Sequence, residues 1–399
     1  MVNGAIEGLE WPKPDELKRI ASERTLSSNE LLALKSRSFY LPIWMLELTR
    51  GRDECNKRTI VTALYNILRE QDTIEDANPA AIPAQAKIKM IDHFGYIMNN
   101  VVKRSPSEPI SDLISDLELM TTTLLPGAMD DDEKVFLEQF AKGSVLEDVR
   151  ANATQTTKEH ILLCVGSMAT GMKRFLEHGK IDTKEQMAEY CSYVAGDVGV
   201  ALNRLVDSVD KVRLDDNCAK TFGRSLQQIN IIKNIHEDWK KRGVVYVPKE
   251  LYADVDNETL FNPESKEGKS ARKSVLETMI ADTTKDLKMS ADYIVSIPQG
   301  LTGYRGFTAI PFFAAIETLR AIEAAGAEKL FGGEEGAAKI SPEVFGNIAS
   351  FAYQIMRLQE GKRAGEFMQA YRDALLDRPK EYSFEPRRFE IWTEEQLKS

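Results

Sequence analysis

Residues 64–76, LYNILREQDTIED, combine a helical apolar pattern with two carboxylates on one helix face. Asp72 and Asp76 are four residues apart, so on a helix their side chains lie one above the other. Like charges at this spacing repel each other, whereas Mg²⁺ prefers several oxygen ligands. Arg69, one turn earlier, is placed to contact an anion such as a diphosphate on the same metal. The alternative interpretation is a solvated acidic helix end before the Asn78–Pro79 stop.

A second oxygen-bearing stripe is formed by Asn230, Asn234 and Asp238, which follow one another at intervals of four residues. Isoleucines flank this stripe, and a buried amide is costly unless it is hydrogen-bonded, so the stripe favours a ligand. Lys233 and the basic run at 240–242 add positive charge nearby. The alternative is an amphipathic helix with an ordinary polar face.

The two stretches together are more specific than either alone. Two oxygen-rich helices that are far apart in sequence can face each other across a helical bundle and hold Mg²⁺ with a bound diphosphate. The expected metal ligands are Asp72, Asp76, Asn230, Asn234 and Asp238. The acidic run at 130–133 predicts a helix start instead. No dinucleotide-binding glycine motif, P-loop or G-x-S-x-G motif is present, and the four histidines lack metal-ligand spacing.

Length and periodicity predict an all-α chain. The 399 residues, 43% of them hydrophobic, are enough for one large helical domain with an apolar cavity or for two domains. No Pro/Gly/Ser-rich linker divides the chain, which favours a single domain at 1–399, with its core at about 31–376 and a polar, aromatic tail at 378–399. Strand signals are nearly absent, and the spacing predicts roughly ten or more helices. Continuous helical segments are expected at 190–206 and 275–287, and longer loops are expected at 77–83, 254–270 and 332–342.

Charge and hydropathy exclude several classes of partner. The formal net charge of −10 is a poor match for nucleic acid or an anionic membrane surface. The N-terminus lacks a signal-peptide pattern, and no apolar run is long enough for a transmembrane helix. The four cysteines are scattered and are interpreted as reduced core thiols. We therefore expect a soluble, cytoplasmic protein without a stable membrane anchor.

The chain resembles the squalene/phytoene synthases over roughly residues 31–351. The segments that carry the resemblance are SRSF at 36–39, DTIED at 72–76, GM with FL between 171 and 176, YCSYVAGDVG at 190–199, NIIK at 230–233 and AIP at 309–311. The resemblance implies a class I isoprenoid synthase fold, a helical bundle around a central cavity that takes a prenyl diphosphate and Mg²⁺. By the same resemblance, Tyr190 would stand beside the reacting carbon. The diphosphate would be held by Ser36, Arg37, Tyr65, Arg69 and Lys233.

Departures from the squalene synthase pattern narrow the function. Asn234 stands where that family carries an aspartate, and Phe312 stands where it usually carries glutamine. The segment Lys339–Glu343 replaces a basic stretch that helps squalene synthases hold NADPH, so the 2′-phosphate would lose its partners. The C-terminal membrane helix of the family is also not recognisable. These differences predict an enzyme that does not use NADPH.

The altered second motif resembles the N-x-x-x-S/T-x-x-x-E motif of class I terpene cyclases, and in this frame it resembles the fungal α-humulene synthases. The resemblance implies a carbon–oxygen lyase that cyclises farnesyl diphosphate with about two or three Mg²⁺ ions. Ring closure from C1 to C11 and proton loss to the released diphosphate would give α-humulene. Phe39, Tyr65 and Tyr190 would stabilise the carbocation. Phe307 is a further candidate, with plain core packing as its alternative.

Two other functions stay open at this point. One is condensation of two prenyl diphosphates, a farnesyltransferase activity of the squalene synthase type that could stop at presqualene diphosphate or give a phytoene-like product. The other is a non-catalytic relative that binds a prenyl diphosphate or acts as an assembly partner. A homodimer also stays open, as does the role of the tail aromatics, which could dock or remain solvated.

Overall fold

Helices make up the regular structure of the residues that the computed structural model describes, which are 12–46, 54–128, 130–298, 300–334 and 336–357. No β-strand occurs in these ranges, which confirms the all-α prediction. The expected tail at 378–399 lies outside the described residues. Buried apolar side chains from α2 to α17 form one continuous cluster, although the single domain stays a prediction.

The first half of the chain forms short helices around two long ones. These elements are α2 (Pro14–Glu23), α3 (Ser28–Lys35), α4 (Arg37–Met45), α5 (Glu54–Asp76), α6 (Ala84–Lys103), α7 (Ser111–Leu124), the 3₁₀ turn η2 (Leu125–Gly127), α8 (Asp131–Phe140) and α9 (Ser144–Asn152).

The second half contains the longest helices and two π-helical segments. These elements are α10 (Gln155–His178), α11 (Lys184–Cys191), the π-helix η3 (Ser192–Gly196), α12 (Asp197–Asp210), α13 (Asp216–Glu237), the π-helix η4 (Asp238–Arg242), the 3₁₀ turn η5 (Lys249–Tyr252), α14 (Asn257–Phe261), α15 (Lys266–Ser296), α16 (Thr302–Gly332) and α17 (Pro342–Arg357).

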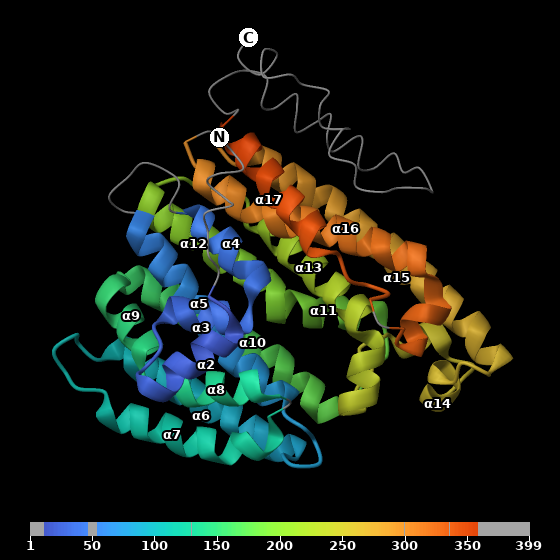
Figure 1. The fold of residues 1–399 in the computed structure, drawn as a ribbon, viewed down its shortest axis with the longest axis horizontal. Helices are drawn as coiled ribbons and strands as arrows, with labels where there is room; N and C mark the ends of the chain where they lie inside the picture. The colour runs from blue at the N-terminus through green and yellow to red at the C-terminus, as the bar shows by residue number, and fades with distance from the viewer. Residues whose placement is uncertain (1–11, 47–53, 129, 299, 335, 358–399) are drawn as a thin grey trace, which may run out of the picture.

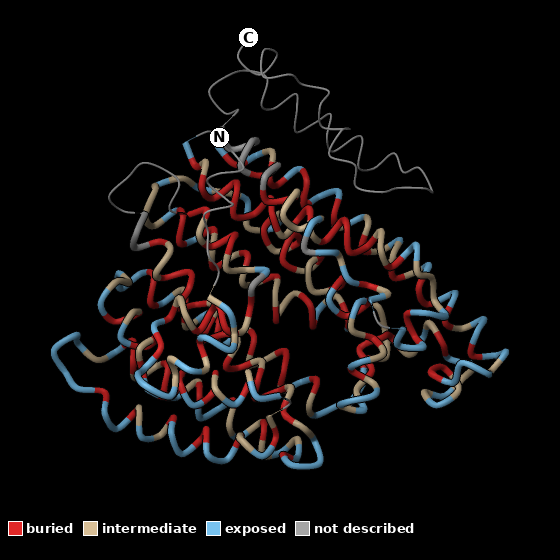
Figure 2. The backbone as a smooth tube through the Cα atoms, in the orientation of Figure 1, coloured by how far each residue is buried: buried red, intermediate tan, exposed pale blue. Residues whose placement is uncertain are grey.

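The helices are arranged around α5, α10 and α13. In Figure 1, α6 and α7 lie along one side of the molecule, and α15, α16 and α17 lie along the other. Helix α13 packs against α12, α15 and α16, while α5 packs against α3, α9 and α10. Buried residues follow the sides of these helices that face one another, and exposed residues follow the outer sides (Figure 2).

Helix α5 brings the first carboxylate pair to the end of a buried rod. Ile60, Leu64, Ile67 and Ile74 are almost fully buried, and their spacing of three, four and seven residues is that of one helix face. The helix ends at Asp76, as the Asn78–Pro79 stop predicts. The backbone amide of Asn78 donates to the carbonyl of Gly127 at 2.9 Å, which fixes this helix end against η2.

Glycines allow α13 to approach the preceding helices closely. A Cβ at Gly223 would overlap the carbonyl of Ala195, and a Cβ at Gly199 would overlap the carbonyl of Ala219. Backbone therefore packs directly on backbone at both places. Close packing accounts in the same way for both glycines of the YCSYVAGDVG segment, since a Cβ at Gly196 would lie within 3.0 Å of Lys220.

Two sequence expectations need correction. The segment 190–206 is not one regular α-helix, because the π-helix η3 interrupts it after Cys191. The expected loop at 254–270 contains α14 and the start of α15, whose first turns are capped by the side chains of Asp256 and Ser265. Helix α14 has only five residues and carries too little periodicity to be recognised in advance, and the first turn of α15 precedes its apolar pattern at 275–287. The expected connections at 77–83 and 332–342 are confirmed, and Asp130 caps α8 as predicted.

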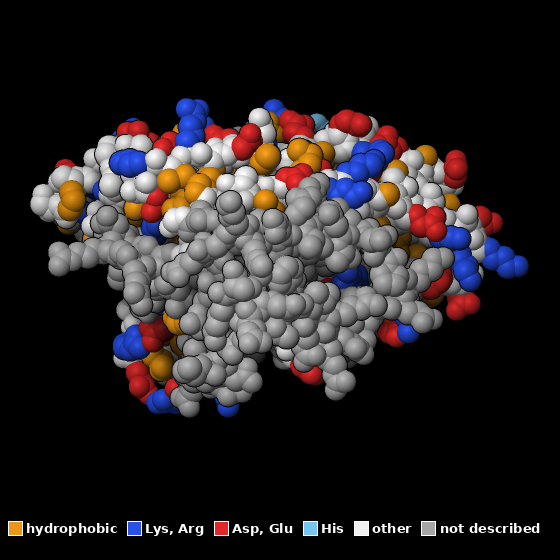
Figure 3. Space-filling view, turned by 90° about the horizontal axis from the view of Figure 1, so that it is seen from above, with side chains coloured by type: hydrophobic (Ala, Val, Ile, Leu, Met, Phe, Trp, Pro, Cys, Tyr) orange, Lys and Arg blue, Asp and Glu red, His pale blue; other side chains and the backbone are white. Residues whose placement is uncertain are grey.

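The face of the molecule in Figure 3 carries charges of both signs and some hydrophobic side chains. On the face shown in Figure 3, Lys and Arg side chains lie among Asp and Glu side chains around the grey atoms. Within the described ranges, no helix combines the length and the apolar character needed to cross a bilayer.

The glycine contact gives a stability prediction. Gly223→Ala should lower the free energy of unfolding by about 1–3 kcal/mol, because the added methyl group forces α13 away from Ala195. Gly166→Ala is the matched control, since Gly166 is exposed within α10 and no atom lies within 4 Å of its added Cβ. The control should be neutral or slightly stabilising. Equal midpoints of the two variants in chemical denaturation would contradict this account of the contact.

Candidate functional site

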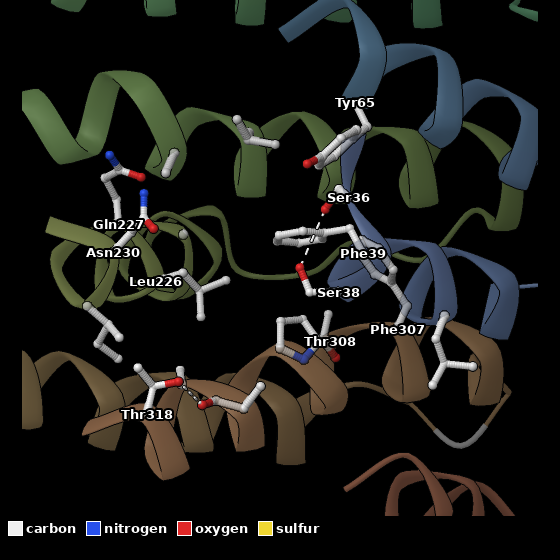
Figure 4. Close-up of a pocket in the computed structure, with 18 of the residues that line it drawn as sticks. Ser36, Ser38, Phe39, Tyr65, Leu226, Gln227, Asn230, Phe307, Thr308 and Thr318 are labelled. Atoms are coloured by element: carbon white, nitrogen blue, oxygen red, sulfur yellow. Dashed lines mark hydrogen bonds between the residues drawn. The ribbon is translucent and has the colours of Figure 1, made fainter. Parts of the chain in front are cut away.

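A cavity of about 1570 Å³ opens between α4, α5, α12, α13, α16 and α17. Figure 4 shows Gln227 and Asn230 of α13 on one side, with Phe39 and Tyr65 across from them and Thr308 and Thr318 on α16 below. Much of the remaining lining is apolar, as a site for a hydrocarbon chain requires.

One end of the cavity gathers cationic and polar side chains. Arg69 donates to the carboxylate of Asp72 at 2.7 Å, and both residues line the cavity. Burial alone would lower the pKa of the Arg69 guanidinium, but Asp72 and other anionic neighbours raise it overall. Lys35 lines the same region, and its ammonium lies 3.3 Å from the buried carboxylate of Glu133. Glu133 is also 3.9 Å from Arg69, so one carboxylate holds two cavity cations in place.

Arg242 joins the two acidic segments of the site. Arg242 of η4 donates to the carboxylate of Asp76 at the end of α5, and it also donates to Asp238 at 2.7 Å. Asp238 is buried and Asp76 is half-buried. A single guanidinium therefore holds two carboxylates from helices that are more than 160 residues apart in sequence. The predicted meeting of the two acidic segments is present in the fold.

The electrostatics of this cluster favour more positive charge than the protein itself supplies. Burial raises the pKa of Asp238 to about 7, against the lowering effect of Arg242. Burial also raises the pKa of Asp76, and it raises the pKa of Glu75 well above its usual range. Carboxylates that are buried near one another resist ionisation until a cation compensates them.

The donor set fits Mg²⁺. Asp72, Asp76 and Asp238 supply hard carboxylate oxygens, and Asn230 and Asn234 of the second stripe supply amide oxygens. In the described part of the chain, no three Asp, Glu, His or Cys side chains have already converged on one point, and Arg242 lies between two of the carboxylates. A metal ion that took the same carboxylate oxygens would displace the guanidinium.

The asparagines of the second stripe lie next to each other. The side-chain amide of Asn234 donates to the side-chain oxygen of Asn230 at 3.2 Å. Asn230 and Lys233 line the cavity, whereas Asn234 is not among the described lining residues. Desolvation lowers the pKa of Lys233, although Glu237 and Asp238 oppose this effect.

The first motif of the resemblance contributes to the opposite wall. Ser36 and Ser38 line the cavity with their hydroxyl oxygens 3.4 Å apart, and the rings of Phe39 and Tyr65 lie 5.3 Å apart (Figure 4). Burial raises the pKa of the Tyr65 hydroxyl, while Arg69 and Ser36 lower it in part. Arg37 begins α4, but its side chain lies outside the described part of the structure.

Tyr190 lies next to the first acidic motif, and its predicted place beside the reacting carbon stays a prediction. Its hydroxyl donates to the two carboxylate oxygens of Glu75 at 3.2 and 3.1 Å, and its ring lies 5.5 Å from Phe175 and 5.3 Å from Tyr246. Tyr190 is buried, and it is absent from the described lining of the cavity. Its contact with Glu75 supports α5 between Asp72 and Asp76.

Three charged residues of the site escaped sequence reasoning. Lys35 precedes the SRSF motif and had no distinguishing pattern of its own. Glu133 belongs to the acidic run at the start of α8, where Asp130 alone provides the cap. The extra acidic residues of this run are the only sequence signal for the ion pair of Glu133 with Lys35. In the sequence Arg242 is one of three neighbouring basic residues with nothing to distinguish it, because its contact with Asp76 crosses the helical bundle.

Similarity to known proteins identifies the family of the chain. Residues 32–342 match the family model described as squalene/phytoene synthase. Squalene synthase ERG9 of Gibberella zeae is 28% identical over 306 residues, covering 73% of this chain and 57% of the relative. Squalene synthase BSS of Botryococcus braunii is 27% identical over 299 residues, covering 73% and 57%. The chain thus spans a little over half the length of these curated relatives.

Solved structures show the same fold. A ligand complex of TcSQS has a TM-score of 0.66 at 22% identity and covers 89% of this chain and 92% of that chain. A dehydrosqualene synthase complex has a TM-score of 0.54 at 18% identity and covers 86% and 99%. The expected all-α isoprenoid synthase fold is confirmed.

The shared guanidinium gives a prediction about metal binding. Mg²⁺ with inorganic diphosphate should raise the Tm of the wild-type protein by about 3 °C or more at saturating concentrations. Asp76→Asn and Asp238→Asn should each remove most of this increase, because each removes one charged ligand. Asp282→Asn is the control, since Asp282 is a half-buried, ion-paired aspartate of α15 outside the cavity lining. If Asp76→Asn and Asp238→Asn kept the full thermal shift, the metal assignment would be wrong.

Proposed function

Because the chain belongs to the squalene/phytoene synthase family, we propose that it is a Mg²⁺-dependent enzyme that ionises an allylic prenyl diphosphate inside the cavity. The observation that carries this proposal is the meeting of Asp76 and Asp238 on Arg242 beside the cationic end of the cavity. A polar, charge-rich end and an apolar remainder match the two parts of a prenyl diphosphate.

The residues around this end have separable tasks. Asp72, Asp76 and Asp238, with Asn230 and Asn234, would hold Mg²⁺, which neutralises charge on a leaving diphosphate when it is bound. Arg69, Lys35 and Lys233 line the cavity and attract the same anion, assisted by the hydroxyl of Ser36. When Arg242 releases its two carboxylates, its guanidinium becomes available to the diphosphate as a further donor.

For the reaction itself, we propose cyclisation of one farnesyl diphosphate to a C15 hydrocarbon such as α-humulene. Asn234 replaces a metal-binding aspartate of squalene synthases, which supports this choice, and so does the loss of basic residues at 339–343, where Lys339 and Ser341 line the cavity. The ring faces of Phe39, Tyr65 and Phe307 can stabilise a carbocation by about 0.5–2 kcal/mol each. No histidine is among the described lining residues, so the leaving diphosphate is the proposed base.

Condensation of two prenyl diphosphates is the second candidate. The relatives named above are squalene synthases, and a cavity of about 1570 Å³ has room for two isoprenoid chains. Similarity to named proteins therefore favours condensation, whereas the departures of this chain favour cyclisation. A third candidate, a non-catalytic binding relative, is tested by calorimetry with a non-hydrolysable prenyl diphosphate in the presence and absence of Mg²⁺.

The product of the reaction separates the two enzymatic candidates. Purified protein with farnesyl diphosphate and Mg²⁺, without NADPH, should release a C15 hydrocarbon that gas chromatography with mass spectrometry identifies. A parallel incubation with NADPH should give the same product at the same rate. A C30 product that requires NADPH would sink the cyclisation proposal and establish condensation.

Substitution of the proposed ligands tests the machinery that both enzymatic candidates share. Asp72→Ala and Asn234→Ala should each lower kcat by more than about 100-fold, since each removes an oxygen ligand near the leaving group. Asn100→Ala is the control, because Asn100 lies on α6 and its side-chain amide contacts only the carbonyl of Tyr96 among the described hydrogen bonds. Steady-state rates of diphosphate release measure the effect. Activity close to wild type in both ligand variants would rule out this metal site.

A further inference from the structure

Away from the cationic end, four aromatic side chains form a wall of the cavity. We call this set, Phe222, Tyr293, Tyr304 and Phe307, the aromatic wall. All four are buried, with Phe222 and Tyr293 ring centroids 5.9 Å apart and Tyr304 and Phe307 ring centroids 5.8 Å apart. The wall is built from α13, α15 and α16, so its shape depends on how three helices pack.

The hydroxyl groups of the two tyrosines are tied to one amide. Tyr293 donates to the side-chain oxygen of Asn203 at 2.5 Å, and Tyr304 lies 3.4 Å from the same oxygen. The two tyrosine oxygens are 3.0 Å apart. Asn203 is buried on α12 and is absent from the described cavity lining. The hydroxyls therefore point behind the wall, and the rings are what the cavity presents.

The orientation of Asn203 is itself fixed. Its side-chain amide nitrogen donates to the backbone carbonyl of Asp215 at 3.0 Å and lies 3.4 Å from a carboxylate oxygen of Asp216. Asp215 is the N-cap of α13. Since both ends of the amide are engaged, the tyrosines are held relative to the start of α13, the same helix that carries the Asn230–Asn234 stripe.

The aromatic wall lies nearer the start of α13 than the cationic end of the cavity does. Phe222 precedes Asn230 by eight residues on α13, which corresponds to about 12 Å along the helix axis. An isoprenoid chain whose diphosphate lies near Asn230 would extend toward Phe222. The aromatic wall is thus where the distal part of such a chain would end.

We propose that Asn203 is a positioning residue that selects the product by fixing this wall. It acts through Tyr293 and Tyr304, whose hydroxyls it withholds from the cavity so that only ring faces contact the distal end of the hydrocarbon chain. A fixed wall permits few chain conformations, and the conformation of the chain decides which carbons bond. The proposal rests on the proposed function, because it concerns the same cavity and a prenyl diphosphate substrate.

The central test is Asn203→Leu, which removes the shared acceptor and keeps a side chain of similar size. The ratio of the major product to all minor products should fall by about threefold or more, while the KM for farnesyl diphosphate should stay within about twofold. The double variant Tyr293→Phe with Tyr304→Phe removes both donors and should give a similar shift. Adding Asn203→Leu to the double variant should produce little further change, since all three groups act as one unit.

A matched tyrosine–asparagine pair provides the control. Tyr252 is buried and donates to the side-chain oxygen of Asn257 at 3.0 Å, but it is outside the described cavity lining. Asn257→Leu should change the Tm and leave the product ratio unchanged. An Asn203→Leu variant that changes the Tm and keeps the wild-type product ratio would overturn the proposal, because a purely structural role predicts that result.

A separate measurement keeps this test distinct from the proposed function. If wild-type protein does not turn over farnesyl diphosphate, the proposed function fails while the wall can still be examined by calorimetry. The probes are non-hydrolysable C10, C15 and C20 prenyl thiolodiphosphates with Mg²⁺. Wild-type protein should discriminate among the chain lengths, and Asn203→Leu should reduce that discrimination by about threefold or more. Equal discrimination in both proteins would overturn the role of Asn203.

Discussion

The bond network of Asp76, Arg242 and Asp238 is the constraint on which the rest of the site depends. Two carboxylates in a partly dry position cannot remain charged near each other without a cation. Arg242 supplies that cation from within the chain, so the ends of α5 and α13 can be held together before any ligand arrives. Next to Asp76, the carboxylate of Glu75 accepts a hydrogen bond from Tyr190. Toward the cavity, Glu133 forms ion pairs with Lys35 and Arg69.

The sequence predicts those residues of the site that recur with the helical period. The spacing of Asp72 and Asp76 and the stripe that ends at Asp238 are visible in a single chain because residues four apart share a face. It does not predict Arg242, whose contact with Asp76 crosses the bundle, nor Lys35, whose neighbour Glu133 comes from another helix. Tertiary contacts of this kind leave no periodic trace. The π-helices escaped for a related reason, since they depend on packing more than on local preference.

The cavity joins two chemical environments through one helix. Near Asn230 and Lys233, α13 is exposed to solvent and rich in charged groups. Near Phe222, the same helix is buried among aromatic rings. In the proposed reaction, water can stabilise the charged groups near Lys233 and Asn230, and its exclusion near Phe222 would protect a carbocation from capture. Asn203 binds the hydroxyl groups of Tyr293 and Tyr304, which keeps these polar groups out of the apolar part of the cavity.

The spacing of Asp238 and Arg242 in η4 limits which insertions and deletions this segment can accept. Each residue of a regular helix turns the chain by about 100°, so one inserted or deleted residue would rotate everything beyond it to another face. Asp238 and Arg242 of η4 are four residues apart, a spacing at which helical side chains can form an ion pair. An insertion or deletion between them would therefore turn Arg242 away from Asp238. Substitutions at Lys240 or Lys241 would keep that spacing, whereas a shorter segment would cost the bridge to α5.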